Sequence, residues 1–213
     1  MKNRALGFSY ILIFVLLIAS CLIAWPDKGI KVLWGALALA FLYLLPAILE
    51  RWLKITIPPL LKYLIFLFLF MCLDVGGILS VFKRYDMWDN FVHFTSGFLT
   101  CTVGLSMINI LNRDPLSLKK LRPCFIFVFI LIFAMAVGLL WEYCEFTADS
   151  LFGTNQMTDT LLNNGQIDIG LLDTMSDLLT SQAAALLMSI YYYHAVRKER
   201  WLKLDRIIIR LER

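Results

Sequence analysis

Residues 123–146 read PCFIFVFILIFAMAVGLLWEYCEF, and this stretch decides the fold class. It contains no charged residue from Cys124 to Trp141, and its length matches the thickness of a bilayer core, which a helix of about 20 apolar residues spans. Backbone groups in lipid must pair within their own segment, so the stretch predicts a transmembrane α-helix. Glu142 and Glu145 lie at its far edge.

Other apolar runs of similar length predict an all-α polytopic membrane protein with about six transmembrane helices. They cover roughly residues 8–25, 30–49, 57–82, 91–111 and 172–193. Of the 213 residues, 60% are hydrophobic and 17% are charged, whereas soluble domains contain about 25% charged residues. No polar block is long enough to fold alone, so we expect a single transmembrane domain over residues 1–213.

The Lys and Arg residues predict the orientation of these spans. With six spans and an inner N-terminus, only four of the twenty fall on the outer side, namely Lys28, Lys31, Lys83 and Arg84. Inner loops carry the excess of positive charge in membrane proteins. We therefore expect a multi-pass membrane protein with both termini in the cytoplasm.

The basic tail, residues 198–213, is predicted to be an amphipathic helix on the cytoplasmic membrane surface. Its apolar residues recur three and four positions apart, which places them on one helical face; they are Trp201, Leu204, Ile208 and Leu211. The Arg side chains would then contact anionic lipid head groups. The alternative is a docking helix for a partner protein. This distribution of charge favours membrane lipids over nucleic acid as the partner. The sequence leaves the oligomeric state open.

Acidic residues and one histidine gather at the predicted outer ends of the spans. They recur three or four residues apart, as in Asp89 and His93 or Asp173 and Asp177, so each pair shares a helix face. Like charges near the membrane are costly, and a cation, shared protons or water must compensate them. The predicted ligands of a divalent metal are His93, Glu142, Glu145, Asp173 and Asp177. Asp74 and Asp89 are candidate catalytic residues, as a general base or as groups that orient the ligands.

Oxygen and imidazole ligands suit Mg, Ca, Mn, Zn or Fe, and the lack of clustered Cys and Met disfavours soft metals. Simpler interpretations also fit some of these residues. Asp173 can be the cap of its helix, and solvated loop charges would account for Asp86, Asp89, Asp149, Asp159 and Asp168. The outer loop 153–170 is either a lid over the acidic residues or a mobile solvent loop.

Four short motifs resemble the YjdF-like family of small uncharacterised bacterial membrane proteins. They are His93-Phe94-Thr95-Ser96-Gly97, Trp141-Glu142-Tyr143-Cys144-Glu145, Gly153-Thr154 and Asp173-Thr174-Met175-Ser176-Asp177. They lie between Asp86 and about Ala185, and the first two helices match nothing specific. The basic residue that usually precedes the histidine is absent here. The resemblance implies a fold and a site and does not imply a reaction.

Three functions fit this pattern. The first is a metal-dependent hydrolase or transferase that acts on lipid-linked substrates at the outer leaflet. The second is a non-catalytic sensor, scaffold or accessory subunit that uses the acidic outer face. The third is a cation- or proton-coupled transporter, which needs polar groups through both halves of the membrane. The apolar run 125–134 disfavours the transporter.

Overall fold

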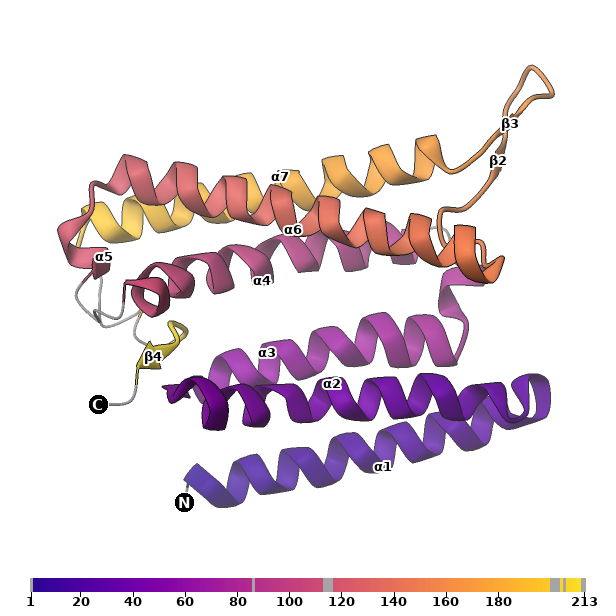
Figure 1. The fold of residues 1–213 in the computed structure, drawn as a ribbon, viewed down its shortest axis with the longest axis horizontal. Helices are drawn as coiled ribbons and strands as arrows, with labels where there is room; N and C mark the ends of the chain where they lie inside the picture. The colour runs from indigo at the N-terminus through magenta and orange to yellow at the C-terminus, as the bar shows by residue number, and fades with distance from the viewer. Residues whose placement is uncertain (1, 86, 113–116, 200–203, 205, 212–213) are drawn as a thin grey trace. The chain divides into compact units, whose positions relative to one another are not determined.

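The computed structural model describes residues 2–85, 87–112, 117–199, 204 and 206–211, and they are mostly helical (Figure 1). The α-helices are α1 (Lys2–Lys28), α2 (Lys31–Leu53), α3 (Pro59–Leu69), α4 (Met87–Leu111), α5 (Ser117–Lys120), α6 (Pro123–Phe152) and α7 (Leu171–Arg197). Helix α3 continues into a π-helix, η1 (Phe70–Ile78), and the 3-10 turn η2 (Val81–Lys83) follows. The predicted all-α membrane fold is confirmed.

Among the described residues, five helical segments are long and apolar enough to cross a membrane. They are Gly7–Lys28, Lys31–Leu53, Pro59–Ile78, Met87–Leu111 and Pro123–Phe152. They coincide with five of the six predicted spans. Helix α7 matches the sixth in position and is 27 residues long, but it is more polar and does not belong to this group. The sixth crossing therefore stays a prediction.

The chain divides into two compact units. Unit 1 consists of Met1–Val92, Ser106–Ser117 and Trp201–Arg213, and unit 2 consists of His93–Leu105 and Leu118–Arg200. Helix α4 contributes residues to both. Each unit is held together by helices with apolar faces, because a helix must bury such a face against another element.

In unit 1, helices α1, α2 and α3 with η1 pack around an apolar core. Leu17, Leu39, Tyr43 and Phe66 are buried in it. The rings of Tyr43 and Phe66 meet edge to face with 6.0 Å between their centroids, an arrangement that aromatic pairs prefer. The regular helices α1, α2 and α3 therefore pack against the irregular η1 segment.

The π-helix η1 is the main departure from regular helix in unit 1. The backbone N–H of Leu79 donates to the carbonyl of Asp74, five residues earlier, over 2.9 Å. On α1, the ammonium group of Lys28 donates to the carbonyls of Gly77 and Ile78, each over 2.8 Å. Lys28 thereby satisfies carbonyls at the end of the π-helix. Short π segments inside helices are often found at functional sites.

The tail differs from its prediction. Among its described residues, Arg210 and Leu211 form strand β4, which pairs antiparallel with strand β1 (Ile55–Thr56). The backbone N–H of Ile209 also donates to the hydroxyl of Ser106 over 3.1 Å. The predicted amphipathic helix over 198–213 is therefore wrong for this end of the tail, because a partner strand takes up its backbone groups. Trp201 lies outside the described residues.

In unit 2, helices α6 and α7 run antiparallel and pack along their length, and residues 93–105 of α4 pack against them. A short hairpin of strands β2 (Thr160–Leu161) and β3 (Ile167–Asp168) projects from the ends of α6 and α7 (Figure 1). Buried polar contacts tie α4 to α7, as in the 2.7 Å hydrogen bond between the hydroxyls of Thr102 and Tyr192.

Candidate metal centre

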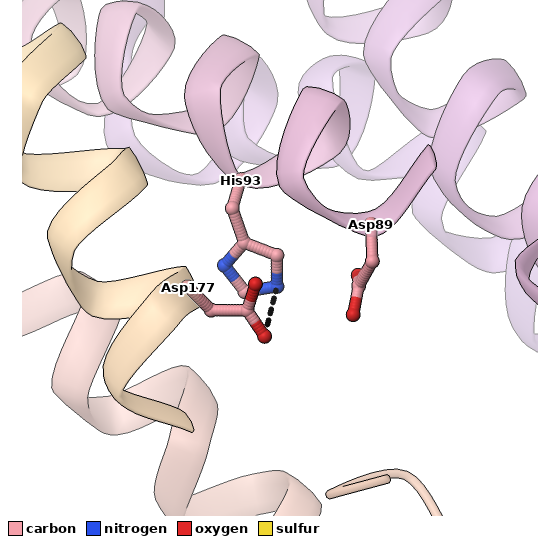
Figure 2. Close-up of side chains that lie close together, drawn as sticks. All are labelled: Asp89, His93 and Asp177. Carbon is pink, nitrogen blue, oxygen red and sulfur yellow. Dashed lines mark ion pairs between the residues drawn. The ribbon is translucent and has the colours of Figure 1, made fainter. Parts of the chain in front are cut away.

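A buried histidine and a buried aspartate meet where α4 and α7 pack together. The His93 side chain lies in the second turn of α4, and Asp177 lies in the second turn of α7. They are 7% and 1% exposed. Nε2 of His93 and Oδ2 of Asp177 are 3.7 Å apart (Figure 2). This is an ion-pair distance, but it is too long for a direct hydrogen bond between these two atoms.

Asp89 completes a group of three ligands. It precedes His93 by one helical turn on the unbroken helix α4, so helix geometry sets the position of one side chain relative to the other. Figure 2 shows all three side chains directed toward a common region. One ligand atom from each of Asp89, His93 and Asp177 lies within 4.8 Å of the others.

The donor set suits a divalent cation. Two carboxylates carry two negative charges, which one divalent cation neutralises, and the imidazole adds a neutral nitrogen ligand. Bonds of about 2.1 Å place neighbouring donors about 3.4 Å apart in a tetrahedral site. The 3.7 Å between His93 and Asp177 is close to that spacing. Three protein ligands also leave coordination positions for water or a substrate.

Gly97 lets α4 and α7 approach closely at this level. An added Cβ at Gly97 would lie 2.2 Å from the backbone oxygen of Ser181 and 2.9 Å from Cβ of Ala184. Small residues at helix contacts let backbones come together in membrane proteins. Gly97 is one turn after His93, and Ser181 is one turn after Asp177, so this contact sets the separation of the two ligands. Gly97 stands in the motif with His93, but the sequence alone does not show that it sets this approach of the helices.

The two predicted ligands from α6 lie outside this group. Glu142 is buried, with 4% of its surface exposed, but its carboxylate is not among the ligand atoms that gather within 4.8 Å. Glu145 accepts a hydrogen bond from the indole Nε1 of Trp141 over 2.9 Å. Their predicted role as ligands stays a prediction.

Other outer acidic residues support the loop that follows α6. Asp149 accepts a hydrogen bond from the Thr154 hydroxyl over 2.5 Å. It also accepts hydrogen bonds from the backbone N–H of Gln156 over 2.8 Å and from that of Met157 over 2.9 Å. Asp173 of α7, a predicted ligand, accepts one from the backbone N–H of Thr158 over 2.9 Å.

Asp168 likewise accepts from the backbone N–H of Leu172 over 2.6 Å. The loop is thus tied down at its base by three carboxylates, and these charges are more than solvated surface groups. Asp159 is exposed, and Asp86 lies outside the described residues.

Asp74 belongs to a different part of the molecule. It lies in η1 of unit 1, is fully buried, and is not in the three-residue group. Its predicted role in catalysis stays a prediction.

A family model described as "Predicted membrane protein (DUF2238)" matches residues 8–198. The match covers the five candidate spans and helix α7. No curated protein matches the chain. No solved structure matches it either.

Proposed function

We propose a divalent-cation-binding function for this chain, which belongs to the DUF2238 family of predicted membrane proteins. The supporting observation is the group formed by Asp89, His93 and Asp177, whose ligand atoms lie within 4.8 Å of one another. A membrane helix does not need this group in order to fold, and each buried charge is costly unless a counter-charge accompanies it. The charges of the two carboxylates match one divalent cation.

The open coordination positions favour an enzyme over a purely structural site. A divalent cation held here would polarise an ester or phosphoryl oxygen and activate a bound water. Asp89 lies nearest the outer end of the group and is then the carboxylate placed to take a proton. We infer that the substrate is a lipid-linked group at the outer leaflet, because the side chains lie at the membrane edge in the predicted orientation.

The proposed setting is the bacterial cell membrane, with both termini in the cytoplasm. Membrane lipids surround the spans. The basic residues between 197 and 213 then face the anionic head groups of the inner leaflet. This contact needs charge alone, so it does not depend on the tail being a helix.

The test is metal binding by the purified full-length protein after treatment with a chelator. We expect about one equivalent of a divalent ion to bind, with Mg²⁺, Ca²⁺, Mn²⁺ and Zn²⁺ compared by calorimetry. The variants Asp177→Asn and His93→Ala should weaken binding about tenfold or more, since each removes one of three ligands. The matched control is Asp159→Asn, which removes an exposed carboxylate from the outer loop.

Equal affinity in wild type and Asp177→Asn would contradict the proposal, as would a wild-type protein that binds none of the four ions. If the metal binds but no lipid-linked ester is cleaved in a metal-dependent way, the cation-binding function stands and the enzymatic part is refuted.

A further inference from the structure

A second buried carboxylate lies in unit 1, apart from the metal centre. Asp74 is 0% exposed and sits within the span Pro59–Ile78. Neither of its carboxylate oxygens has a hydrogen bond of normal geometry among the described residues. An isolated carboxylate in such surroundings costs several kcal/mol, so a native structure compensates it.

Hydroxyl groups from two other helices interact with Asp74. The hydroxyl of Ser20, on α1, interacts with the carboxylate, and the phenol of Tyr43, on α2, lies within its electrostatic reach. Ser20 is 5% exposed and Tyr43 is 0% exposed. The Tyr43 hydroxyl, like the carboxylate, lacks a hydrogen-bond partner in the described part of the chain. Three elements thus contribute buried oxygens that interact with one another.

No described side chain supplies the compensating positive charge. Lys28 is the basic residue of α1 that reaches η1, and its ammonium group donates to the carbonyls of Gly77 and Ile78. Lys62 of α3 pairs with Glu50 over 2.6 Å. The titratable groups on which the charge of Asp74 acts are Cys21 of α1 and Tyr43 of α2, and neither is cationic.

We propose that Asp74 binds one monovalent cation, a sodium ion or a proton, in the core of unit 1. One carboxylate neutralises one positive charge, and the hydroxyls of Ser20 and Tyr43 are neutral groups that can either coordinate sodium or hydrogen-bond a carboxylic acid. The donors are all oxygen, as a hard cation requires. This site is separate from the divalent centre and does not depend on it.

The test is the thermal unfolding of the full-length protein in detergent, followed by its tryptophan fluorescence. Two series are compared: sodium chloride against choline chloride at fixed ionic strength, and about pH 5 against about pH 9. A ligand that binds only the folded state raises the unfolding temperature, here by about 3 °C or more at saturation. A sodium-dependent rise identifies sodium, and a rise confined to low pH identifies a proton.

Asp74→Asn should abolish whichever dependence the wild type shows, and the control Asp159→Asn should retain it. If Asp74→Asn does not fold, Tyr43→Phe serves as the second variant, because it keeps the ring and removes one oxygen. It should raise several-fold the concentration of sodium ions or protons that gives half of the rise in unfolding temperature. The proposal is overturned if the wild type responds to neither series, or if the variants at Asp74 and Tyr43 respond like the wild type. Asp177→Asn should leave both responses unchanged, which separates this test from that of the divalent site.

Discussion

Gly97 controls how closely α4 approaches α7 near His93 and Asp177. A methyl group at this position would lie 2.2 Å from the Ser181 backbone oxygen, and backbone cannot rotate away as a flexible side chain can. Gly97→Ala should therefore destabilise the protein by about 1–3 kcal/mol, the usual cost of overpacking. It should also weaken divalent-ion binding, because His93 and Asp177 move apart. Thermal unfolding and calorimetry measure the two effects.

Gly138 is the matched control for this substitution. It lies on α6, and an added Cβ would lie 3.5 Å from the Ser181 hydroxyl, an ordinary contact. Gly138→Ala should be neutral or should stabilise by up to about 1 kcal/mol, because alanine favours helix. If the two alanine variants have the same stability, close packing at Gly97 is not what positions the ligands.

The residues of the candidate site were partly predictable from sequence. The four-residue spacing of Asp89 and His93 predicts that they share a helix face, and the fold brings Asp177 to them. The sequence could not show which of the predicted ligands would gather within 4.8 Å, since spacing within a helix says nothing about the face that meets another helix. A single intramembrane carboxylate such as Asp74 signals a function but does not reveal its neighbours.

At the scale of elements, the loop between α6 and α7 is held by Asp149. Its carboxylate accepts three hydrogen bonds from the loop, including the backbone N–H groups of Gln156 and Met157. Hydrogen bonds to a charged group contribute about 1.5–3 kcal/mol each. Asp149→Ala should therefore increase amide hydrogen exchange at Gln156 and Met157 about tenfold or more.

Asp159→Ala, in the same loop, should leave exchange at these two amides unchanged. Unchanged exchange in Asp149→Ala as well would show that packing holds the loop, for example at Gly170, where an added Cβ would lie 2.6 Å from Cβ of Met157. The loop could then still be a cover over the acidic groups, but Asp149 would not be its anchor.

Helix positions were predictable because bilayer thickness fixes the length of an apolar run. The π-helix η1 was not, since the residues of 70–78 other than Asp74 are apolar or glycine, and their pattern contains no signal of a changed hydrogen-bond register. The tail was predicted to be a helix because the spacing of Leu204, Ile208 and Leu211 suits one, but its end forms a strand. The pairing of Arg210 with Thr56 depends on a segment far away in sequence, and local periodicity cannot detect it.

At the scale of the whole molecule, the pairing of β1 with β4 bears on the number of crossings. Thr56 and Arg210 are paired residues, so they lie on the same side of the membrane. An even number of crossings must then separate them. Only three of the five apolar spans lie between these residues, Pro59–Ile78, Met87–Leu111 and Pro123–Phe152. The strand pairing therefore predicts that helix α7 supplies the fourth crossing, despite its polarity.

The six-span topology predicts which single cysteines, in a cysteine-free background, react with an impermeant maleimide on each side of the membrane. Lys54→Cys and Arg210→Cys should react only when the cytoplasmic face is accessible. Lys31→Cys and Asp159→Cys should react from outside intact cells. Labelling of positions 54 and 210 from opposite sides would refute both the strand pairing and the six-span topology.

The same strand pair constrains the order of assembly during synthesis. Strand β1 leaves the ribosome early, but its partner β4 does not exist until α4, α6 and α7 have been translated. Unit 2 can therefore be complete in the membrane while unit 1 still lacks a strand. Newly made chains that stop after Arg197 should contain Asp89, His93 and Asp177 but lack strand β4, so the edge of β1 is the part that membrane proteases and chaperones encounter open.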